Sequence, residues 1–315
     1  MMQGWRAAGQ VRAGCVAALP PLGWLSRARG VAAGTSGGEA RGEGRGGDRG
    51  RDGSGDDAAA GGATAAGRIL VMGGSGFVGS HVCREALGRG VEVTALSRAG
   101  APASAGGAAW VRSVRWVRGD ALAMDSADAW AEALEGCEAV VAAVGGFGSA
   151  TQMERVCGDT TVRLARAARA AGHVRRMAFV SAADLSGVPP LGTLLRGYWA
   201  GKWKGEQAVA ECFPDGGVSL RPGMVYGERV LPGGRTVNLG LIGAPLERGI
   251  NLANGKVDLG RVPLLGPALA SAPIDVEVLA RACVTSATDA RVAAGVKEVP
   301  EIHAIAALGP EGESR

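Results

Sequence analysis

The sequence contains no long, uninterrupted apolar stretch. Its longest apolar run starts at Ala139 and passes Val144, well short of the roughly 18 residues that span a bilayer. We therefore expect a buried strand there and no transmembrane segment. The net charge is only +4, and no Lys/Arg run is interleaved with aromatic residues. Nucleic acid is therefore not an expected partner.

Paired cysteines are also missing. None of the six cysteines belongs to a Cys-x-x-Cys motif, and no histidine follows at a metal-ligand spacing. This pattern argues against a disulfide framework or a zinc site, and it predicts small buried thiols in a reducing compartment. The cysteines are Cys15, Cys83, Cys137, Cys157, Cys212 and Cys283.

Acidic residues are absent from residues 1–38, which contain Arg6, Arg12, Arg27 and Arg29. An Arg-rich, acid-free leader is typical of an organellar transit peptide. A secretory signal is the alternative, but Pro20 and Pro21 interrupt its apolar run. We predict a mitochondrial location, with the chloroplast as the alternative.

Residues 39–67 combine Gly, Ala and charges of both signs. This composition buries too little apolar area to offset the entropy of ordering, so we predict a disordered linker. The folded region is expected to span residues 68–308, with a frayed tail at 309–315.

The segment 68–98 has the pattern of a strand, a glycine turn, a helix and a second strand. This is the βαβ unit of a parallel sheet, and the expected fold is an α/β doubly wound Rossmann sheet. Such turns bring a dinucleotide pyrophosphate to a helix N-terminus. The predicted contacts are Gly73, Gly74, Ser75, Gly76, Phe77, Val78 and Gly79.

The second strand ends in Ser97 and Arg98. An NAD site usually places Asp or Glu here for the ribose 2′-hydroxyl, whereas arginine suits a 2′-phosphate. Glu92 lies too early to bind the ribose. We therefore predict NADP as cofactor, with NAD second. The alternative is that Arg98 is a solvated charge at a strand end.

Further strands are expected at 114–118, 139–144 and 176–180, with helices at 123–134 and 153–171. Asp120 follows the third strand, where it could bind the adenine amino group or cap the turn. Gly145 opens a glycine loop after the fourth strand, on the ligand side of a doubly wound sheet; a plain flexible loop is the alternative. Arginines 163, 166 and 169 follow helical spacing and predict a solvated stripe.

A predicted helix at 194–210 carries Tyr198 and Lys202, four residues apart and therefore on one face. A lysine cation favours the phenolate of a nearby tyrosine, which suits the tyrosine to general acid–base chemistry. The same lysine can hold the nicotinamide ribose. Scarcity favours this interpretation, because the only other tyrosine is Tyr226. The alternative is a surface pair without chemistry.

The motifs GGSGFVG at 73–79, Tyr-x-x-x-Lys at 198–202 and RPGMVYG at 221–227 resemble those of the short-chain dehydrogenase/reductase superfamily, in its extended and atypical members. The phrases VVAAVGGFGS, FVSAADL, LLRGYWAGKWKGE and SLRPGMVYGER resemble one atypical branch more closely. That branch holds organellar plant and algal proteins, a fungal mitochondrial protein associated with coenzyme Q biosynthesis and, more distantly, the nucleotide-binding accessory subunit of complex I. The resemblance implies Tyr198 as acid/base and Lys202 as its activator.

The sequence departs from this family at Ser181. Active extended members usually carry Ser or Thr just beyond the fifth strand, and here Ala182 and Ala183 follow Ser181. Either Ser181 reaches the substrate oxygen or the catalytic triad is incomplete, and a missing oxyanion contact costs about 10² to 10³ in rate.

The family also implies a small C-terminal lobe, at about 228–272, that closes over the substrate. Its apolar residues would suit a hydrophobic, quinone-related small molecule, although most are expected to pack against the core. Asp275 is expected to cap a last helix at 276–287. Two functions remain open: an NAD(P)-dependent oxidoreductase, and a non-catalytic nucleotide-binding subunit or scaffold of a mitochondrial membrane-associated complex.

Overall fold

The computed structural model describes residues 67–102, 108–230, 236–238 and 272–309. A seven-stranded sheet has the strand order β11-β6-β5-β4-β1-β2-β3, and every neighbouring pair is parallel. Its strands are β1 Arg68–Met72, β2 Glu92–Ser97, β3 Val114–Arg118, β4 Cys137–Ala142, β5 Arg176–Val180, β6 Gly217–Leu220 and β11 Gly295–Lys297. The predicted doubly wound Rossmann sheet is confirmed.

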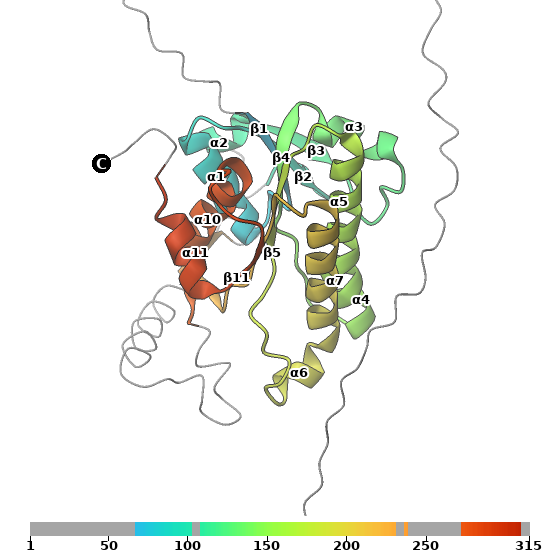
Figure 1. Ribbon diagram of the computed structural model, residues 1–315, viewed down its shortest axis with the longest axis vertical. Coiled ribbons are helices and arrows are strands. Elements are labelled where there is room, and N and C mark those ends of the chain that lie inside the picture. Colours follow the sequence, from blue (N-terminus) through green and yellow to red (C-terminus); the bar gives the residue numbers. More distant parts are fainter. Residues whose placement is uncertain (1–66, 103–107, 231–235, 239–271, 310–315) are drawn as a thin grey trace, which may run out of the picture. The chain divides into compact units, whose positions relative to one another are not determined.

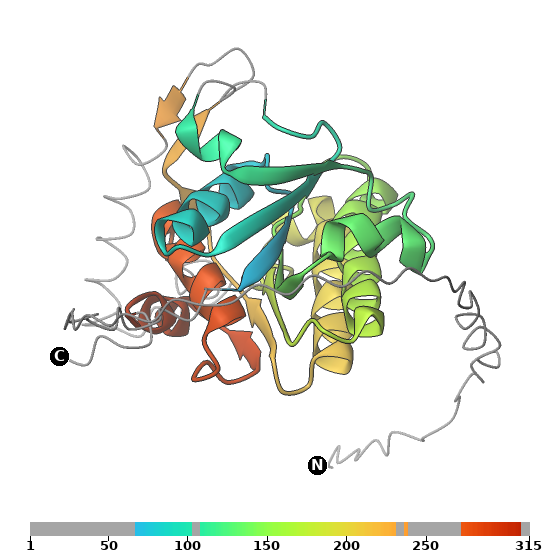
Figure 2. The same cartoon turned by 90° about the horizontal axis from the view of Figure 1, so that it is seen from above.

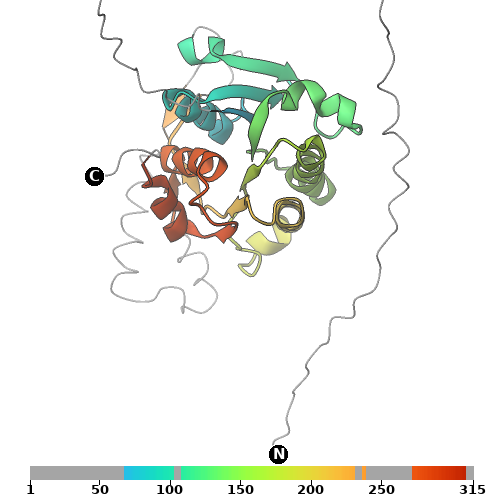
Figure 3. The ribbon, with the colours of Figure 1, turned by 45° about the horizontal axis from the view of Figure 1, so that its top comes forward.

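Helices cover both faces of the sheet (Figures 1 and 3). On β1, Ile69 and Val71 join a core with α1, α10 and α11, while Leu70 and Met72 face the core of α3, α5 and α7. This alternation follows the two-residue period of a strand. The helices are α1 Phe77–Gly88, α2 Ala109–Arg112, α3 Ala127–Leu134, α4 Ala150–Glu154, α5 Thr160–Ala171, α6 Leu191–Leu194, α7 Arg196–Cys212, α10 Val276–Thr288 and α11 Val299–Ala306.

Several boundaries differ from those predicted. α3 begins after Ser126 rather than at Ala123, because the Ser126 hydroxyl caps the amide of Ala129. The predicted helix at 153–171 corresponds to three consecutive elements: α4, then a π-helical turn over Arg155–Asp159, then α5. The predicted helix at 194–210 is split, because Leu195 leaves helical geometry between α6 and α7. The Asp275 cap on α10 is confirmed.

The sheet changes direction of winding at β1, whose neighbours are β2 and β4. Ligands of doubly wound sheets bind beyond the carboxyl ends of the strands at such a point. Seen from above in Figure 2, the chain after β3 crosses to the other face of the sheet before β4. The fold therefore places the functional site after β1, β2 and β4.

Two short pairings lie beside the main sheet: β7 Val225–Tyr226 with β10 Ile274–Asp275, and β8 Glu228–Val230 with β9 Thr236–Asn238. Most of the predicted lobe at 228–272, the leader at 1–38 and the linker up to residue 66 lie outside the described residues, as do residues 310–315. In the part of the chain that the structure describes, no helix combines the length and apolarity needed to cross a bilayer.

Candidate functional site: a dinucleotide cavity beside a buried lysine

The glycine turn joins β1 to α1 with almost no side chains. Gly73 has a φ of +88°, a conformation that favours glycine. An added Cβ at Gly79 would lie 2.7 Å from the Gly73 carbonyl carbon, so α1 packs directly on the turn. Gly76 caps α1 without any side-chain hydrogen bond. The helix N-terminus is therefore open to an anion, as a pyrophosphate requires.

A cavity of about 620 Å³ opens beyond the carboxyl ends of β1, β2, β3 and β4. Seven of the predicted cofactor contacts line it: Gly73, Ser75, Gly76, Ser97, Arg98, Asp120 and Gly145. The other five predicted contacts are not among the lining residues: Gly74, Phe77, Val78, Gly79 and Lys202. An added Cβ at Gly74 would lie 2.7 Å from the Cβ of Ala95. An uncapped helix, a turn nearly without side chains and a cavity of this volume at the strand ends together fit a dinucleotide.

Two arginines line the cavity next to each other. Ser97, at the end of β2, pairs with Arg118 on β3, and the Arg118 Nε donates to the Arg98 carbonyl at 3.3 Å. Arg118 was not predicted from the sequence, although its place at the end of a neighbouring strand could have revealed it. The Ser97 hydroxyl donates to the Gly100 carbonyl at 2.5 Å and thereby holds the turn that carries Arg98.

Asp120 is the one carboxylate among the described residues that line the cavity. Its Oδ1 accepts the Leu122 amide at 2.9 Å, so the turn cap is present. The adenine contact stays a prediction. Among the residues given a position in the structure, no group of three or more His, Cys, Asp or Glu side chains could hold a metal ion.

Lys202 is buried against the carboxyl ends of β4 and β5. Its side chain is 3% exposed, and its Nζ donates to the carbonyls of Val180 at 2.7 Å and Val144 at 3.2 Å. Burial lowers the pKa of Lys202 to about 8, against the opposing effects of Cys157 and Glu206. An ammonium has three protons and these two carbonyls accept two, while the Nζ also lies over the Phe179 ring, 4.9 Å from its centroid.

Three glycines let α7 approach closely enough to bury this lysine. An added Cβ at Gly201 would lie 2.9 Å from the carbonyl oxygen of Glu154, and one at Gly205 would lie 2.8 Å from the Phe179 ring. Gly197, one turn earlier, packs against Ala150. The same π-helical turn that meets Gly201 also places Val156 on the cavity wall. Close helix packing therefore sets the position of Lys202.

Tyr198 lies one turn before Lys202, and the lysine Nζ is 5.6 Å from the centroid of its ring. The ring also stacks on Phe147, with 5.6 Å between centroids and 12° between planes. Burial raises the pKa of Tyr198, and Cys157 adds to the rise. The sequence suggested a lowering by Lys202, but shielding of the phenol from water outweighs that attraction.

Ser181 has a different neighbour from the one expected. Its hydroxyl donates to Glu206 at 2.5 Å, its side chain is 2% exposed, and it does not line the cavity. Arg221 binds the same carboxylate with Nε at 2.8 Å and Nη2 at 2.6 Å, which raises the pKa of Arg221. Contact of Ser181 with a substrate stays a prediction. Glu206 and Arg221 were missed, although Arg221 opens the RPGMVYG motif.

The parallel sheet, the glycine turn and the cavity define a Rossmann-type nucleotide-binding domain. A family model described as NAD(P)H-binding matches residues 73–225. A curated relative, an uncharacterized chloroplastic protein of Arabidopsis thaliana, is 35% identical over 222 residues, which cover 70% of this chain and 72% of the relative. The chain therefore belongs to the NAD(P)H-binding Rossmann family.

Two solved structures are among those similar to this chain. The UDP-glucose 4-epimerase from Brucella ovis, in complex with NAD, has a TM-score of 0.49 and 21% identity, covering 75% of this chain and 81% of that one. The Bordetella bronchiseptica enzyme WbmH, in complex with NAD+, has a TM-score of 0.48 and 20% identity, covering 74% and 75%. The finer resemblance to coenzyme Q and complex I proteins receives no support from these comparisons.

Proposed function

We propose that the protein is an NAD(P)-dependent oxidoreductase of an organelle, in which Tyr198 exchanges a proton with the substrate. The observation that carries the proposal is Lys202, a buried cation tied to two strand-end carbonyls, one of them from Val144 on the cavity wall, with its Nζ 5.6 Å from the centroid of the Tyr198 ring. A buried lysine is costly to maintain, so its place beside the cavity favours a ligand-binding role. The bound nicotinamide would accept or supply a hydride.

Separate groups of residues are proposed to bind the cofactor and to transfer the proton. The turn at 73–79 and the α1 N-terminus bind the pyrophosphate, and the third proton of Lys202 binds a ribose hydroxyl. Tyr198 then holds or releases the proton at the substrate oxygen. Its raised pKa keeps it protonated at neutral pH, so in a carbonyl reduction it would donate the proton, although proton transfer is best from a group whose pKa is nearer to the working pH.

NADP is the proposed cofactor. Arg98 and Arg118 lie side by side where the ribose 2′-position is expected, and no Asp or Glu ends β2. Two guanidinium groups favour a 2′-phosphate over a hydroxyl.

A hydrophobic, quinone-related substrate is proposed on the basis of Phe147. Its side chain is 74% exposed while one face stacks on Tyr198. A flat apolar molecule that reached the Tyr198 hydroxyl would cover this ring. The chloroplastic relative favours the plastid, which was the alternative location, over the mitochondrion.

The test is a titration of the full chain with NADPH and NADH by calorimetry, followed by turnover of quinone-type substrates in wild type and Tyr198→Phe. We expect tight NADPH binding in both proteins and a loss of about 10² to 10⁴ in turnover for the variant. Retained turnover in Tyr198→Phe would exclude the proposed acid–base role, and failure to bind either nucleotide would exclude the oxidoreductase.

A second candidate is a non-catalytic nucleotide-binding subunit of a larger complex. It is favoured by the buried Ser181, whose hydroxyl is taken by Glu206, and by the alanines that follow it. This candidate predicts that cofactor survives purification and never turns over, and that the protein co-purifies with a large membrane-associated assembly.

A further inference from the structure

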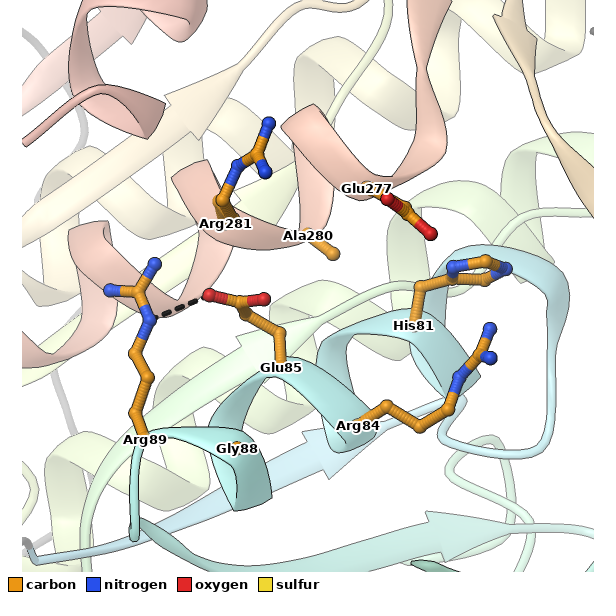
Figure 4. Close-up of a pocket in the computed structure, with 8 residues that line it drawn as sticks. All are labelled: His81, Arg84, Glu85, Gly88, Arg89, Glu277, Ala280 and Arg281. Carbon is orange, nitrogen blue, oxygen red and sulfur yellow. Dashed lines mark hydrogen bonds and ion pairs between the residues drawn. The ribbon is translucent and has the colours of Figure 1, made fainter.

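A second cavity, of about 360 Å³, lies between α1 and α10 (Figure 4). It shares no residue with the dinucleotide cavity. The glycine turn before α1 lines the dinucleotide cavity, and the later turns of α1 line this second cavity. The lining of this second cavity is mostly charged, and its charges fall into two groups.

At one end, Arg89 donates to Glu85 at 2.7 Å and to Thr285 at 2.9 Å. Figure 4 shows Arg281 of α10 across from this pair, with its guanidinium directed away from Glu85. Two arginines and one carboxylate leave an excess charge of +1 at this end. The guanidinium of Arg281 has no hydrogen-bond or ion-pair partner among the described residues.

At the other end, Glu277 points toward His81, and Arg84 lies next to the same ring. The His81 Nε2 lies 3.1 Å from the Glu228 carbonyl, and burial, followed by Arg84, lowers the pKa of this histidine. With His81 neutral, the charges of Arg84 and Glu277 cancel. The excess positive charge of the cavity therefore lies at the Arg281 end.

Arg281 supplies a second observation. Its Nε is buried and finds no hydrogen-bond acceptor in the part of the chain that the structure describes. A buried donor left unsatisfied is costly, so a rotation of the Arg281 side chain that brings its guanidinium to an acceptor in the cavity would be favoured. The lining residues beside Arg281 are small. Ala280 lies on α10, and an added Cβ at Gly88 would meet nothing within 4 Å.

We propose that this end of the cavity binds the phosphate group of a small phosphorylated metabolite, with Arg281 and Arg89 donating to its oxygens. Guanidinium groups bind phosphate oxygens in charge-assisted pairs. The cavity is larger than a bare phosphate, so the rest of the metabolite extends over Ala280 toward His81. This inference concerns a different site from the proposed function and does not rest on it.

The test is calorimetric titration of the full chain with inorganic phosphate, with and without saturating NADPH. The NADPH arm blocks phosphate binding at the glycine turn. We expect phosphate binding in both arms, and a weakening of about tenfold or more in Arg281→Gln. The matched control is Arg166→Gln on α5, an exposed arginine far along the chain from this cavity, which should bind phosphate as the wild type does.

Two further variants locate the phosphate. Gly88→Asp introduces a carboxylate into open space at the proposed end and should abolish binding. Arg84→Gln, at the other end, should leave it nearly unchanged. Absence of phosphate binding in the wild type, or equal losses in Arg281→Gln and Arg166→Gln, would overturn the site. An unchanged affinity in Gly88→Asp, or a large loss in Arg84→Gln, would overturn its placement. The thermal unfolding midpoint of each variant, measured separately, reports on folding.

Discussion

The two halves of the dinucleotide site are built from different material. The half after β1, β2 and β3 consists of turns, in which glycine backbone and strand-end residues form the cavity wall. The half after β4 and β5 depends on α7, whose buried lysine reaches the strand ends only because glycines let the helix approach. Local chain geometry suffices for the first half, whereas the second requires the tertiary packing of α7.

The largest expected effect comes from breaking that packing. An added Cβ at Gly158 would lie 2.8 Å from the Gly201 carbonyl oxygen. Gly158→Leu should lower the free energy of unfolding by about 3 kcal/mol or more, because overpacking forces α7 from the π-helical turn. Urea unfolding measures the change. The control is Gly187→Ala, where an added Cβ meets nothing within 4 Å and stability should stay nearly constant.

The second-largest effect on stability is expected from removing the buried charge of Lys202, and its size depends on pH. The pKa of Lys202 is about 8 in the folded chain, and about 10.4 in an unfolded one. Between these values the unfolded state binds more protons, so Lys202 makes stability rise with pH, by up to about 3 kcal/mol. Lys202→Met should remove this rise. Unfolding experiments at pH 7.5 and pH 10 compare the two proteins, and parallel pH dependences would contradict the burial of the charge.

These two predictions concern the part of the site that the sequence alone could not define. The spacing of Tyr198 and Lys202 was visible, and so was their common helix. Burial of Lys202 depends on Gly158 meeting Gly201, residues from segments far apart in the sequence, and no local pattern reveals that contact. The raised pKa of Tyr198 arises in the same way, because Phe147 and the helix packing shield the ring from water.

The turn half, by contrast, was largely predictable. The absence of Cβ atoms at Gly73, Gly76 and Gly79 is typical of close backbone approach, so the motif predicted the fold and a turn that lines the cavity. Arg118 was missed because its place beside Arg98 depends on the register of β3 against β2. α11 was also missed, although the sequence contains the residues of its start: Glu298 and Glu301 form a capping box, and Pro300 lies between them.

A smaller effect is expected from variants that change the preference between NADPH and NADH. These variants test the half of the site that consists of turns. Arg98→Ala and Arg118→Ala should each weaken NADPH binding about tenfold, the value of one charge-assisted hydrogen bond, and leave NADH binding unchanged. Calorimetry with both nucleotides gives the ratio of the NADPH and NADH affinities. Arg115→Ala is the control, because Arg115 lies on β3 but pairs with Glu135 at 2.8 Å. Equal losses for NADH and NADPH would contradict recognition of a 2′-phosphate.

Asp120→Asn should give the smallest change. The amide oxygen can still accept the Leu122 amide, so the turn is retained, while the charge that would attract the adenine amino group is lost. We expect NADH and NADPH to weaken equally, by about threefold, a fraction of one hydrogen bond. A selective loss of NADPH would instead place Asp120 near the 2′-position.

The π-helical turn at Arg155–Asp159 has a consequence for insertions and deletions. A π-turn holds one residue more than the α-helical path between the same ends, and each residue in an α-helix turns the following ones by about 100°. Deletion of one residue from this turn would restore a continuous α-helix between the same ends, and the residues within the turn would then rotate relative to α4 and α5. Gly158 and Val156 would then no longer face α7 and the cavity together. The length of this segment is therefore as much a part of the site as its side chains.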